Sequence, residues 1–170
     1  MPFYRTLLLH ENSSLFDKLN NSATTQTNYS YDQFGNVLTK ASLGDLTVSG
    51  DEKHVHFEYV YNTSVWIVNT PKHILLASDN FTILRETNIS YDNLAYGQPP
   101  ARGSITRKED RLIGNQNPIT TFSYNSFGNT VNQTDPNGRT TFYVYGFNET
   151  TNTFPDKIIN PKGHETQYLY

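Results

Sequence analysis

Two histidines separated by one residue form the pair in this sequence that could hold a metal ion. His54 and His56 are expected to share one face of an extended strand, because side chains alternate along a strand. Glu58 falls on the same face and would be the third ligand. The polar outer face of a strand is the better explanation of these residues, so we predict no metal ion and no cofactor. The other histidines are expected to be isolated surface residues: His10, His73 and His164.

Residue patterns typical of enzymes are missing from this sequence. The turn Gly-x-Ser-x-Gly, which presents a nucleophilic serine, does not occur. Glu109 and Asp110 are adjacent, so their carboxylates point to opposite faces of an extended chain, which suits solvation better than acid–base catalysis. The absence of cysteine excludes thiol nucleophiles, disulfides and cysteine-based zinc sites. We therefore predict that the chain is not an enzyme and has no catalytic residues.

Aromatic side chains are the next group that could bind a ligand. The sequence has 12 Tyr and 10 Phe, and many of them recur at every second position. Rows of exposed rings could stack against sugars, whereas the same rows are also what a sheet needs for packing between strands. We expect the structural role, and a carbohydrate-binding or adhesion module remains the alternative.

Acceptor sequences for N-glycosylation, Asn-x-Ser/Thr, are frequent. A chain rich in Asn, Ser and Thr produces several by chance, so they indicate an extracellular setting only weakly. The acceptors are Asn12, Asn20, Asn28, Asn62, Asn80, Asn88, Asn132 and Asn148.

Charge and hydropathy exclude two classes of partner. The formal net charge is −3 and the pI about 5.9, so the chain lacks the basic surface of a nucleic-acid-binding protein. No apolar run approaches the roughly 18 residues that cross a membrane. The apolar segment 7–9 is too short for a signal peptide. We expect a secreted or cell-surface protein whose export signal lies outside this chain.

Alternating residues predict the strands that would position these side chains. Residues 54–61 place Val55, Phe57, Tyr59 and Tyr61 on one face. A turn at 62–64, a strand at 65–68, a turn at 70–72 and a strand at 74–76 follow. We expect this hairpin to be the centre of the core. Further extended segments are expected at 29–31, 36–39, 46–48, 81–91, 104–107, 119–124, 129–134, 139–145, 154–159 and 165–170.

Short turns with one composition separate many of these strands. Asp32-Gln33-Phe34-Gly35 has Asp at the first and Gly at the fourth position, as in a type I turn. The Asp side chain can accept a backbone N–H two residues on, and Gly supplies the left-handed conformation. The same pattern recurs at 125–128, 135–138 and 160–163.

The first 26 residues fit this pattern least. Ser13 or Ser14 could cap a short helix that carries Leu15, Phe16 and Leu19 on one face. A meandering lead-in is the alternative, and both remain open. We therefore divide the chain into an irregular lead-in, 1–26, and a repetitive β-sheet segment, 27–170.

Tyrosine-based units recur along the second segment. They centre on Tyr31, Tyr61, Tyr91, Tyr124, Tyr145 and Tyr170, which are 30, 30, 33, 21 and 25 residues apart. The clearest are Tyr31-Asp32-x-x-Gly35-Asn36 and Tyr124-Asn125-x-x-Gly128-Asn129, joined by Tyr91-Asp92 and Asp135-Pro136-Asn137-Gly138. These units resemble the YD repeats of the Rhs/YD-repeat family. Tyr61 is followed by Asn and Tyr145 by Gly, which departs from the family's turn.

This resemblance implies an all-β fold: an antiparallel meander of hairpins in an open, curved sheet, one arc of a larger β-shell. Relatives include Rhs toxins, insecticidal toxin complex B and C components, wall-associated proteins and teneurins. In this family the shell encloses a toxic domain or acts as a scaffold at the cell surface. The family's self-cleaving core region is not seen here, and Asp135-Pro136 is explained as a repeat turn.

We therefore expect a non-catalytic structural segment of a longer, extracellular YD-repeat protein. Its partners would be the rest of that polypeptide, with further repeats and a C-terminal cargo, and in the alternative a carbohydrate. A second alternative is the shell portion of a secreted toxin whose effector lies outside this chain.

Overall fold

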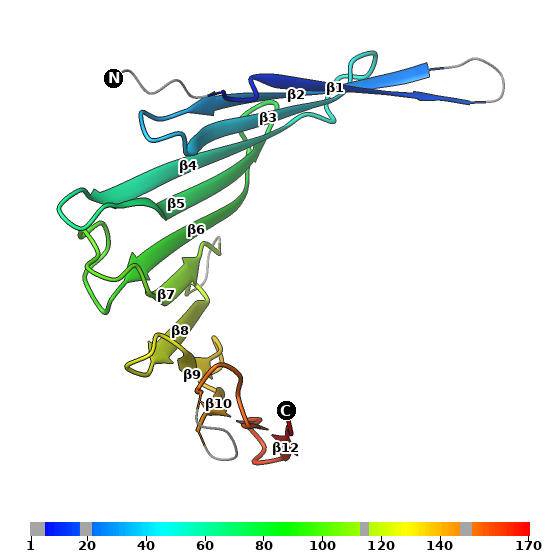
Figure 1. The fold of residues 1–170 in the computed structure, drawn as a ribbon. Coiled ribbons are helices and arrows are strands. Elements are labelled where there is room, and N and C mark those ends of the chain that lie inside the picture. The colour runs from blue at the N-terminus through cyan, green and yellow to red at the C-terminus, as the bar shows by residue number, and fades with distance from the viewer. Residues whose placement is uncertain (1–5, 18–21, 113–115, 147–150) are drawn as a thin grey trace. The chain divides into compact units, whose positions relative to one another are not determined.

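A computed structural model describes residues 6–17, 22–112, 116–146 and 151–170. Within these ranges the chain contains strands and turns and no helix. Strands that follow one another in sequence are neighbours in the sheet, in the order β1 to β12 (Figure 1). The predicted all-β antiparallel meander is therefore confirmed. The strands are β1 His10–Phe16, β2 Ser22–Tyr31, β3 Val37–Asp45, β4 Lys53–Asn62, β5 Ile67–Ser78, β6 Ile83–Tyr91, β7 Ile105–Asp110, β8 Ile119–Tyr124, β9 Thr130–Thr134, β10 Thr140–Val144, β11 Lys157–Ile159 and β12 Glu165–Gln167.

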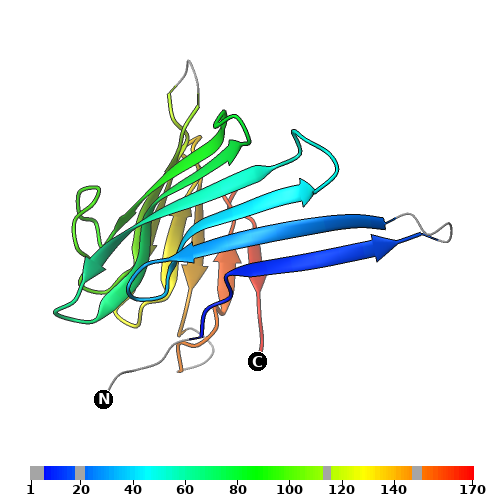
Figure 2. The same cartoon turned by 90° about the horizontal axis from the view of Figure 1, so that it is seen from above.

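The chain forms two compact units, residues 1–87 and 88–170. In the first unit, β1 pairs with β2 over its whole length, from His10 opposite Asn28 to Phe16 opposite Ser22 (Figure 2). A strand thus replaces the short helix or irregular lead-in expected for this region, and Leu19 lies outside the described residues. All residues of β1 are exposed, so an amphipathic helix here would have no apolar face to bury. Backbone hydrogen bonds to β2 therefore stabilise a strand instead of a helix.

The predicted central hairpin is present, but its turn occupies residues 63–66, and the residues expected to turn at 70–72 lie within a strand. The alternating strand at 54–61 is confirmed as β4. Val65 and Trp66 belong to the turn after β4 rather than to a strand, and Trp66 has a left-handed φ of 57°. Pro71, expected in a turn, lies inside β5 opposite Tyr59. A register shift at this point of the β4–β5 pairing tolerates the proline, which cannot donate a ladder hydrogen bond.

Two further expectations in the first unit are wrong. Residues 46–48 are not a strand, because Asp45 closes a turn there: its Oδ1 accepts the N–H of Thr47 at 3.0 Å, and its carbonyl accepts the N–H of Val48 at 2.8 Å. The extended segment expected from Phe81 starts only at Ile83. Phe81 occupies the left-handed turn position instead, with φ 54°, and its N–H donates to the carbonyl of Ser78 at 3.0 Å.

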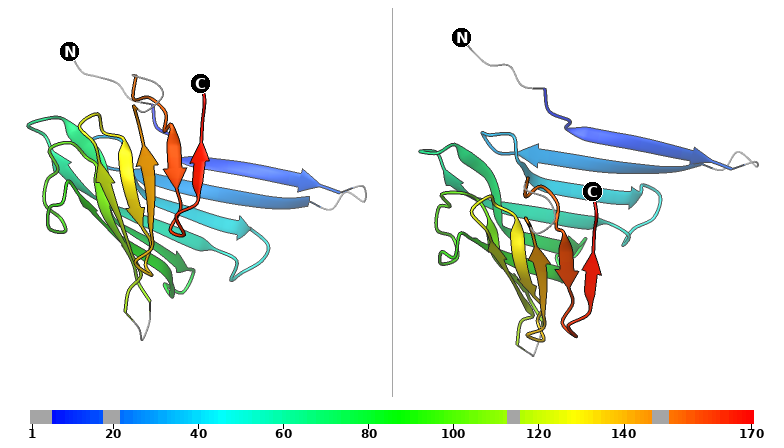
Figure 3. Two further views of the ribbon diagram at one scale, coloured as in Figure 1. Left: turned by 90° about the horizontal axis from the view of Figure 1, so that it is seen from below. Right: turned by 60° about the horizontal axis from the view of Figure 1, so that its bottom comes forward.

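Short hairpins make up most of the second unit. Strand β8 pairs with β7 and β9, β10 with β9 and β11, and β11 with β12, all antiparallel (Figure 3). These strands lie where the sequence predicts them, although their ends differ by a few residues: β7 runs on to Asp110, and β11 starts only at Lys157. The prediction was accurate here because the turns between β8 and β9, β9 and β10, and β11 and β12 each carry an Asp or Asn at the first position and a Gly at the fourth.

Few side chains are fully buried. Among the described residues, the buried apolar ones are Val60, Ala77, Ile89 and Tyr91, so the core is not confined to the predicted hairpin. Many large apolar side chains are exposed, Trp66 by 72% and Phe127 by 70%. No helix in the described ranges could cross a membrane. Hydrogen bonds between strands and within turns therefore supply much of the stability that a thick hydrophobic core supplies in other folds.

Replacing Gly128 tests how far one turn depends on glycine. Its φ is 87°, and a Cβ there would meet nothing within 4 Å, so the cost of a side chain is conformational rather than steric. We expect Gly128→Ala to lower the free energy of unfolding by about 1–2 kcal/mol. Gly128→Asn is the matched control and should cost less, since Asn tolerates this conformation. Urea unfolding measures both, and equal effects would contradict the argument.

Candidate functional site: the linked corners

The turn at Asp32 is held by one carboxylate oxygen. Oδ1 of Asp32 accepts the backbone N–H of Phe34 and the backbone N–H of Asn36, each at 2.8 Å. The N–H of Gly35 donates to the Asp32 carbonyl at 3.1 Å, and the N–H of Asp32 donates to the Asn36 carbonyl at 3.0 Å. These bonds satisfy the backbone groups that leave the strand ladder at the bend. We call such a five-residue turn a corner.

Three more corners begin at Asn125, Asp135 and Asn160 and repeat this pattern. In each, Oδ1 of the first residue accepts the backbone N–H of the third and of the fifth residue, at 2.9–3.0 Å. The glycine N–H donates to the first carbonyl at 2.9–3.1 Å. Asp and Asn are interchangeable at the first position because each offers this oxygen. The predicted side-chain bond two residues on is confirmed, while the second bond, four residues on, was not foreseen.

The tyrosine at the end of a strand reaches back to an earlier part of the chain. Tyr61 donates its hydroxyl to Oδ2 of Asp32 at 2.6 Å. Tyr31 donates to the carbonyl of Leu8 at 2.7 Å, and Tyr124 donates to that of Ile105 at 2.6 Å. Each of these tyrosines directly precedes the first residue of a turn. These three tyrosines therefore tie the bends that follow them to earlier parts of the chain.

The asparagine that closes a corner reaches forward. Nδ2 of Asn36 donates to the carbonyl of Val68 at 2.5 Å, and Nδ2 of Asn129 donates to that of Asn152 at 2.5 Å. The acceptors lie 32 and 23 residues later in the chain. Tyr61 thus joins two bends directly, whereas the two asparagines bond to the backbone of later segments and Tyr31 and Tyr124 to that of earlier ones. This explains why both residue types recur in the Tyr-Asp-x-x-Gly-Asn unit.

Both oxygens of the Asp32 carboxylate are occupied. Oδ2 accepts from Nδ2 of Asn36 at 2.7 Å as well as from Tyr61. Burial alone would raise the pKa of Asp32, but the hydrogen bonds from Tyr61, Asn36 and Phe34 outweigh it and lower the pKa below its usual value of 3.8. Burial, and then the bond to Asp32, raise the pKa of Tyr61 to about 12. A carboxylate with this many donors is an anchor and has little capacity left for proton transfer.

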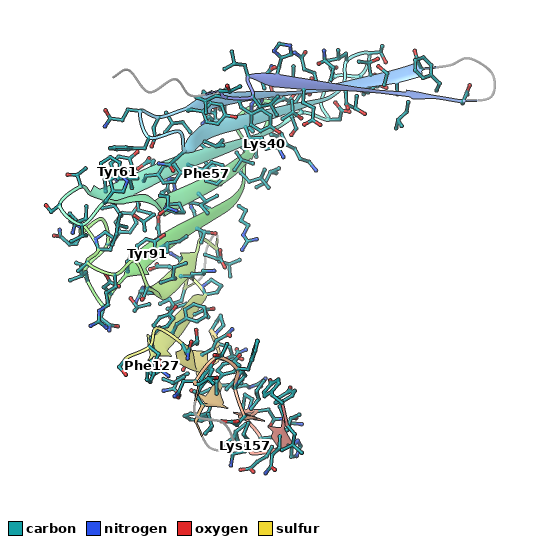
Figure 4. The ribbon with its side chains drawn as sticks, in the orientation of Figure 1. Lys40, Phe57, Tyr61, Tyr91, Phe127 and Lys157 are labelled. Carbon is teal, nitrogen blue, oxygen red and sulfur yellow. The ribbon has the colours of Figure 1, made fainter. Side chains whose placement is uncertain are left out.

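Aromatic rings extend from this corner along β4. Tyr61 stacks on Tyr59 at 6.2 Å between centroids, and Tyr59 stacks on Phe57 at 6.4 Å. Phe34 packs edge-on against Tyr61 at 5.0 Å. Figure 4 labels Phe57 and Tyr61 among the side chains of this strand. The rings contact each other within the sheet, which agrees with the packing role predicted for these rows.

Asp92 uses the same chemistry to hold a much longer turn. Its Oδ2 accepts the backbone N–H groups of Ala101, Arg102 and Gly103 at 2.8–3.2 Å, and its Oδ1 accepts that of Ser104 at 2.9 Å. Burial would raise the pKa of Asp92, but these four donors outweigh it and lower the pKa. The sequence marked Tyr91-Asp92 as a repeat unit, yet nothing local to it showed that its carboxylate anchors residues 101–104.

The histidine pair proposed as a metal site is placed on β4 but gathers no ligand set. His54 stacks on Phe81 at 5.8 Å, and Glu58 pairs instead with Lys72 at 3.3 Å and with His73 at 3.6 Å. Among the described residues no group of three His, Cys, Asp or Glu could hold a metal ion. His73, expected to be isolated, is not: its Nε2 lies 3.0 Å from Oε1 of Glu86, and its side chain is 17% exposed.

The remaining candidates are dispersed. Glu109 lies in β7 and accepts from Arg107 at 2.7 Å and from Asn117 at 2.9 Å; these two bonds lower its pKa. Asp135-Pro136 forms a corner, as predicted. Of the glycosylation acceptors, Asn28 and Asn88 lie in strands as expected, and Asn80 lies in an exposed turn. Asn20 and Asn148 fall outside the described residues.

Comparison with known proteins gives a fold and no family. No protein-family model matches the sequence, and no curated protein matches it. Among solved structures, the chain is similar to one in the crystal structure of TcdB2-TccC3-Cdc42, with a TM-score of 0.50 and 10% identity. The match covers 95% of this chain and 13% of that chain. At this identity the likeness concerns the fold alone.

Substituting Asp32 by Asn tests the charged anchor separately from the turn. Asn fills this position in two other corners, so the turn should persist. The pKa of Asp32 is lowered in the folded state, so its charge stabilises the fold above the ordinary value of 3.8 and this contribution disappears as the pH falls through the folded pKa. Wild type should therefore lose more stability than Asp32→Asn between about pH 5 and pH 2.

Urea midpoints across this pH range measure the difference. Asp135→Asn is the matched control: it also removes the carboxylate of a corner, but one that Tyr61 does not contact. Identical acid sensitivity of wild type and Asp32→Asn would contradict the role assigned to the Asp32–Tyr61 bond.

Asp92→Asn tests the anchor of the long turn. In the wild type, four backbone N–H groups donate to the two carboxylate oxygens of Asp92. The carboxamide of Asn keeps one of these acceptor oxygens and replaces the other by an NH₂ group, which would face N–H donors. We expect a loss of about 1–3 kcal/mol in unfolding free energy and faster hydrogen exchange at the amides of residues 101–104. Asn125→Asp, a swap in the opposite direction at a corner that either residue can fill, should be nearly neutral. Unchanged exchange at residues 101–104 would count against the anchor.

Proposed function

We propose that this chain is a non-catalytic structural segment, part of the wall of a β-shell in an extracellular or cell-surface YD-repeat protein. The linked corners carry this proposal. Tyrosine hydroxyls bond backward and asparagine amides bond forward, so the hairpins that contain these residues are fixed to other segments by side chains as well as by the strand ladder. Such a wall resists the sliding of one hairpin past the next, which a container or scaffold requires.

The saturation of the anchoring carboxylates supports the non-catalytic part. Asp32 and Asp92 each accept four hydrogen bonds within the protein. A general base needs an oxygen free to receive a proton from a substrate. We therefore assign Asp32 and Asp92 a structural role, in which they stabilise turns. The partners we propose are the further repeats and the cargo of a longer polypeptide.

A toxin shell is the more specific version of this proposal. The fold likeness to a chain of the TcdB2-TccC3-Cdc42 structure favours it over an adhesin or a wall protein. In that version the effector is encoded outside this chain, and the segment described here contributes enclosure only.

Electron cryomicroscopy of the natural full-length protein tests the wall. The expected result is that residues 27–170 form successive hairpins of a shell around another segment. Limited proteolysis then probes the links: Asn36→Ala combined with Asn129→Ala should expose the enclosed segment to protease, because both forward bonds are lost. Asn137→Ala, an exposed Asn within a corner, is the matched control. A full-length protein in which these hairpins enclose nothing would overturn the proposal.

A further inference from the structure

The corner that begins at Asp135 contains a residue pair with a reactivity of its own. Only the backbone N–H of the third residue takes part in a corner, so the side chain at this position is free to vary. Asn137, the third residue here, is the one asparagine of the sequence that precedes a glycine. An Asn-Gly pair is the sequence most prone to spontaneous deamidation, because glycine has no side chain that hinders ring closure. The third and fourth positions of the four corners are Phe34-Gly35, Phe127-Gly128, Asn137-Gly138 and Lys162-Gly163.

The reaction joins the side chain of Asn137 to the backbone of Gly138, with water as the second reactant. The backbone nitrogen of Gly138 gives its proton to hydroxide and bonds to Cγ of Asn137. The side-chain nitrogen takes up a proton from water and leaves as ammonia, which regenerates hydroxide and leaves a succinimide ring. Water then opens one of the two C–N bonds of this ring. The product at position 137 is aspartate or isoaspartate, in which the backbone runs through the former side chain.

Solvent has access to this pair. Asn137, Gly138 and Arg139 are exposed. Among the described residues, the side-chain amide of Asn137 has no hydrogen-bond partner that would hold it away from the backbone. A Cβ built on Gly138 would meet no atom within 4 Å, so no other part of the protein covers this peptide. Exposure therefore permits the reaction.

The hydrogen bonds of the corner oppose ring closure. The N–H of Gly138 donates to the carbonyl of Asp135 at 3.0 Å, so the attacking nitrogen is held against Asp135 with its proton in place. The N–H groups of Asn137 and Arg139 donate to Oδ1 of Asp135, each at 2.9 Å, and fix the chain on both sides of Gly138. To reach Cγ of Asn137, the nitrogen must turn about the Cα–C bond of Asn137, which breaks its own bond and displaces Arg139. Deamidation therefore requires the corner to open first.

We propose that Asn137 is a deamidation site gated by its corner: the pair is preserved while the corner is closed and reacts with water when the corner opens. Isoaspartate inserts a methylene group into the backbone, so the N–H groups of Gly138 and Arg139 no longer fit both acceptors on Asp135. Strands β9 and β10 pair directly beyond this corner, with Thr134 opposite Thr140, and the turn sets their register. An opening of this hairpin is thereby recorded permanently. This inference is independent of the proposed wall.

Deamidation of the 170-residue chain tests the site and its gating. The protein is incubated at mildly alkaline pH, either native or unfolded in guanidinium chloride. After digestion, peptide mass spectrometry and isoaspartyl methyltransferase labelling quantify the products at position 137. We expect the unfolded chain to react at least about tenfold faster than the native chain, because a modest free energy of local opening already gives this factor. Equal rates would overturn the gating, and an unfolded chain without isoaspartate at position 137 would overturn the site.

Matched variants separate the corner from the reactive pair. Asp135→Ala removes the oxygen that accepts two N–H groups and should speed native-state deamidation about five- to tenfold. Asp135→Asn is the control and should keep the slow rate, since Asn fills this position in two other corners. Both variants should react like the wild type once unfolded. A native Asp135→Ala protein that deamidates no faster than the wild type would contradict the proposal.

Two changes at position 137 test the consequence for the hairpin. Asn137→Lys copies the corner at 160–164 and should abolish the reaction without changing the urea midpoint. Chains that carry isoaspartate should exchange the amide hydrogens of residues 139–141 at least about tenfold faster than unmodified chains. Asn137→Asp, which copies the other product without the extra methylene group, should exchange like the wild type. Equal exchange in the isoaspartate chains would show that the hairpin recloses and would overturn the permanent record.

Discussion

A single side-chain oxygen at each bend is the interaction on which this structure depends. At Asp32, Asn125, Asp135 and Asn160 it accepts two backbone N–H groups and so satisfies the chain where it leaves the strand ladder. A sheet with few fully buried side chains cannot rely on a thick core to fix its turns. Local hydrogen bonds with fixed geometry take over that task, and each hairpin is thereby specified by its own five residues.

Local specification would leave the hairpins independent of each other, and the tyrosine and asparagine links prevent this. Tyr61 joins its strand to the corner at Asp32, and Asn36 joins the same corner to Val68. Because Asp32 is ionised and shares its oxygens among four donors, these links are charge-assisted and stronger than bonds between neutral groups. The chemistry that makes Asp32 a good anchor also makes it a poor catalyst, and so the proposed function is mechanical.

The two units differ in the side chains that gather on their strands. In the first unit, the rings of Phe57, Tyr59 and Tyr61 pack on each other along one strand. In the second unit, Thr121, Asn132 and Thr134 share a face whose amides and hydroxyls are not all paired. On this face the hydroxyl of Thr134 also bonds to that of its cross-strand partner Thr140, at 2.8 Å, and so adds to the strand pairing.

The meander and the corners at 32, 125, 135 and 160 could be predicted from the amino-acid sequence, because an Asx turn needs only five consecutive residues and a glycine. Where that signal is absent, prediction failed: Trp66 and Phe81 take left-handed turn positions that bulky residues rarely occupy, and Pro71 sits at an irregularity inside β5. The bonds made by the recurring Tyr and Asn, and the anchoring role of Asp92, become visible only in the folded chain. These depend on contacts between residues 9 to 32 positions apart. Apart from the Asp32 carboxylate that Tyr61 reaches, the partners are backbone carbonyls and N–H groups, which carry no signal in the sequence.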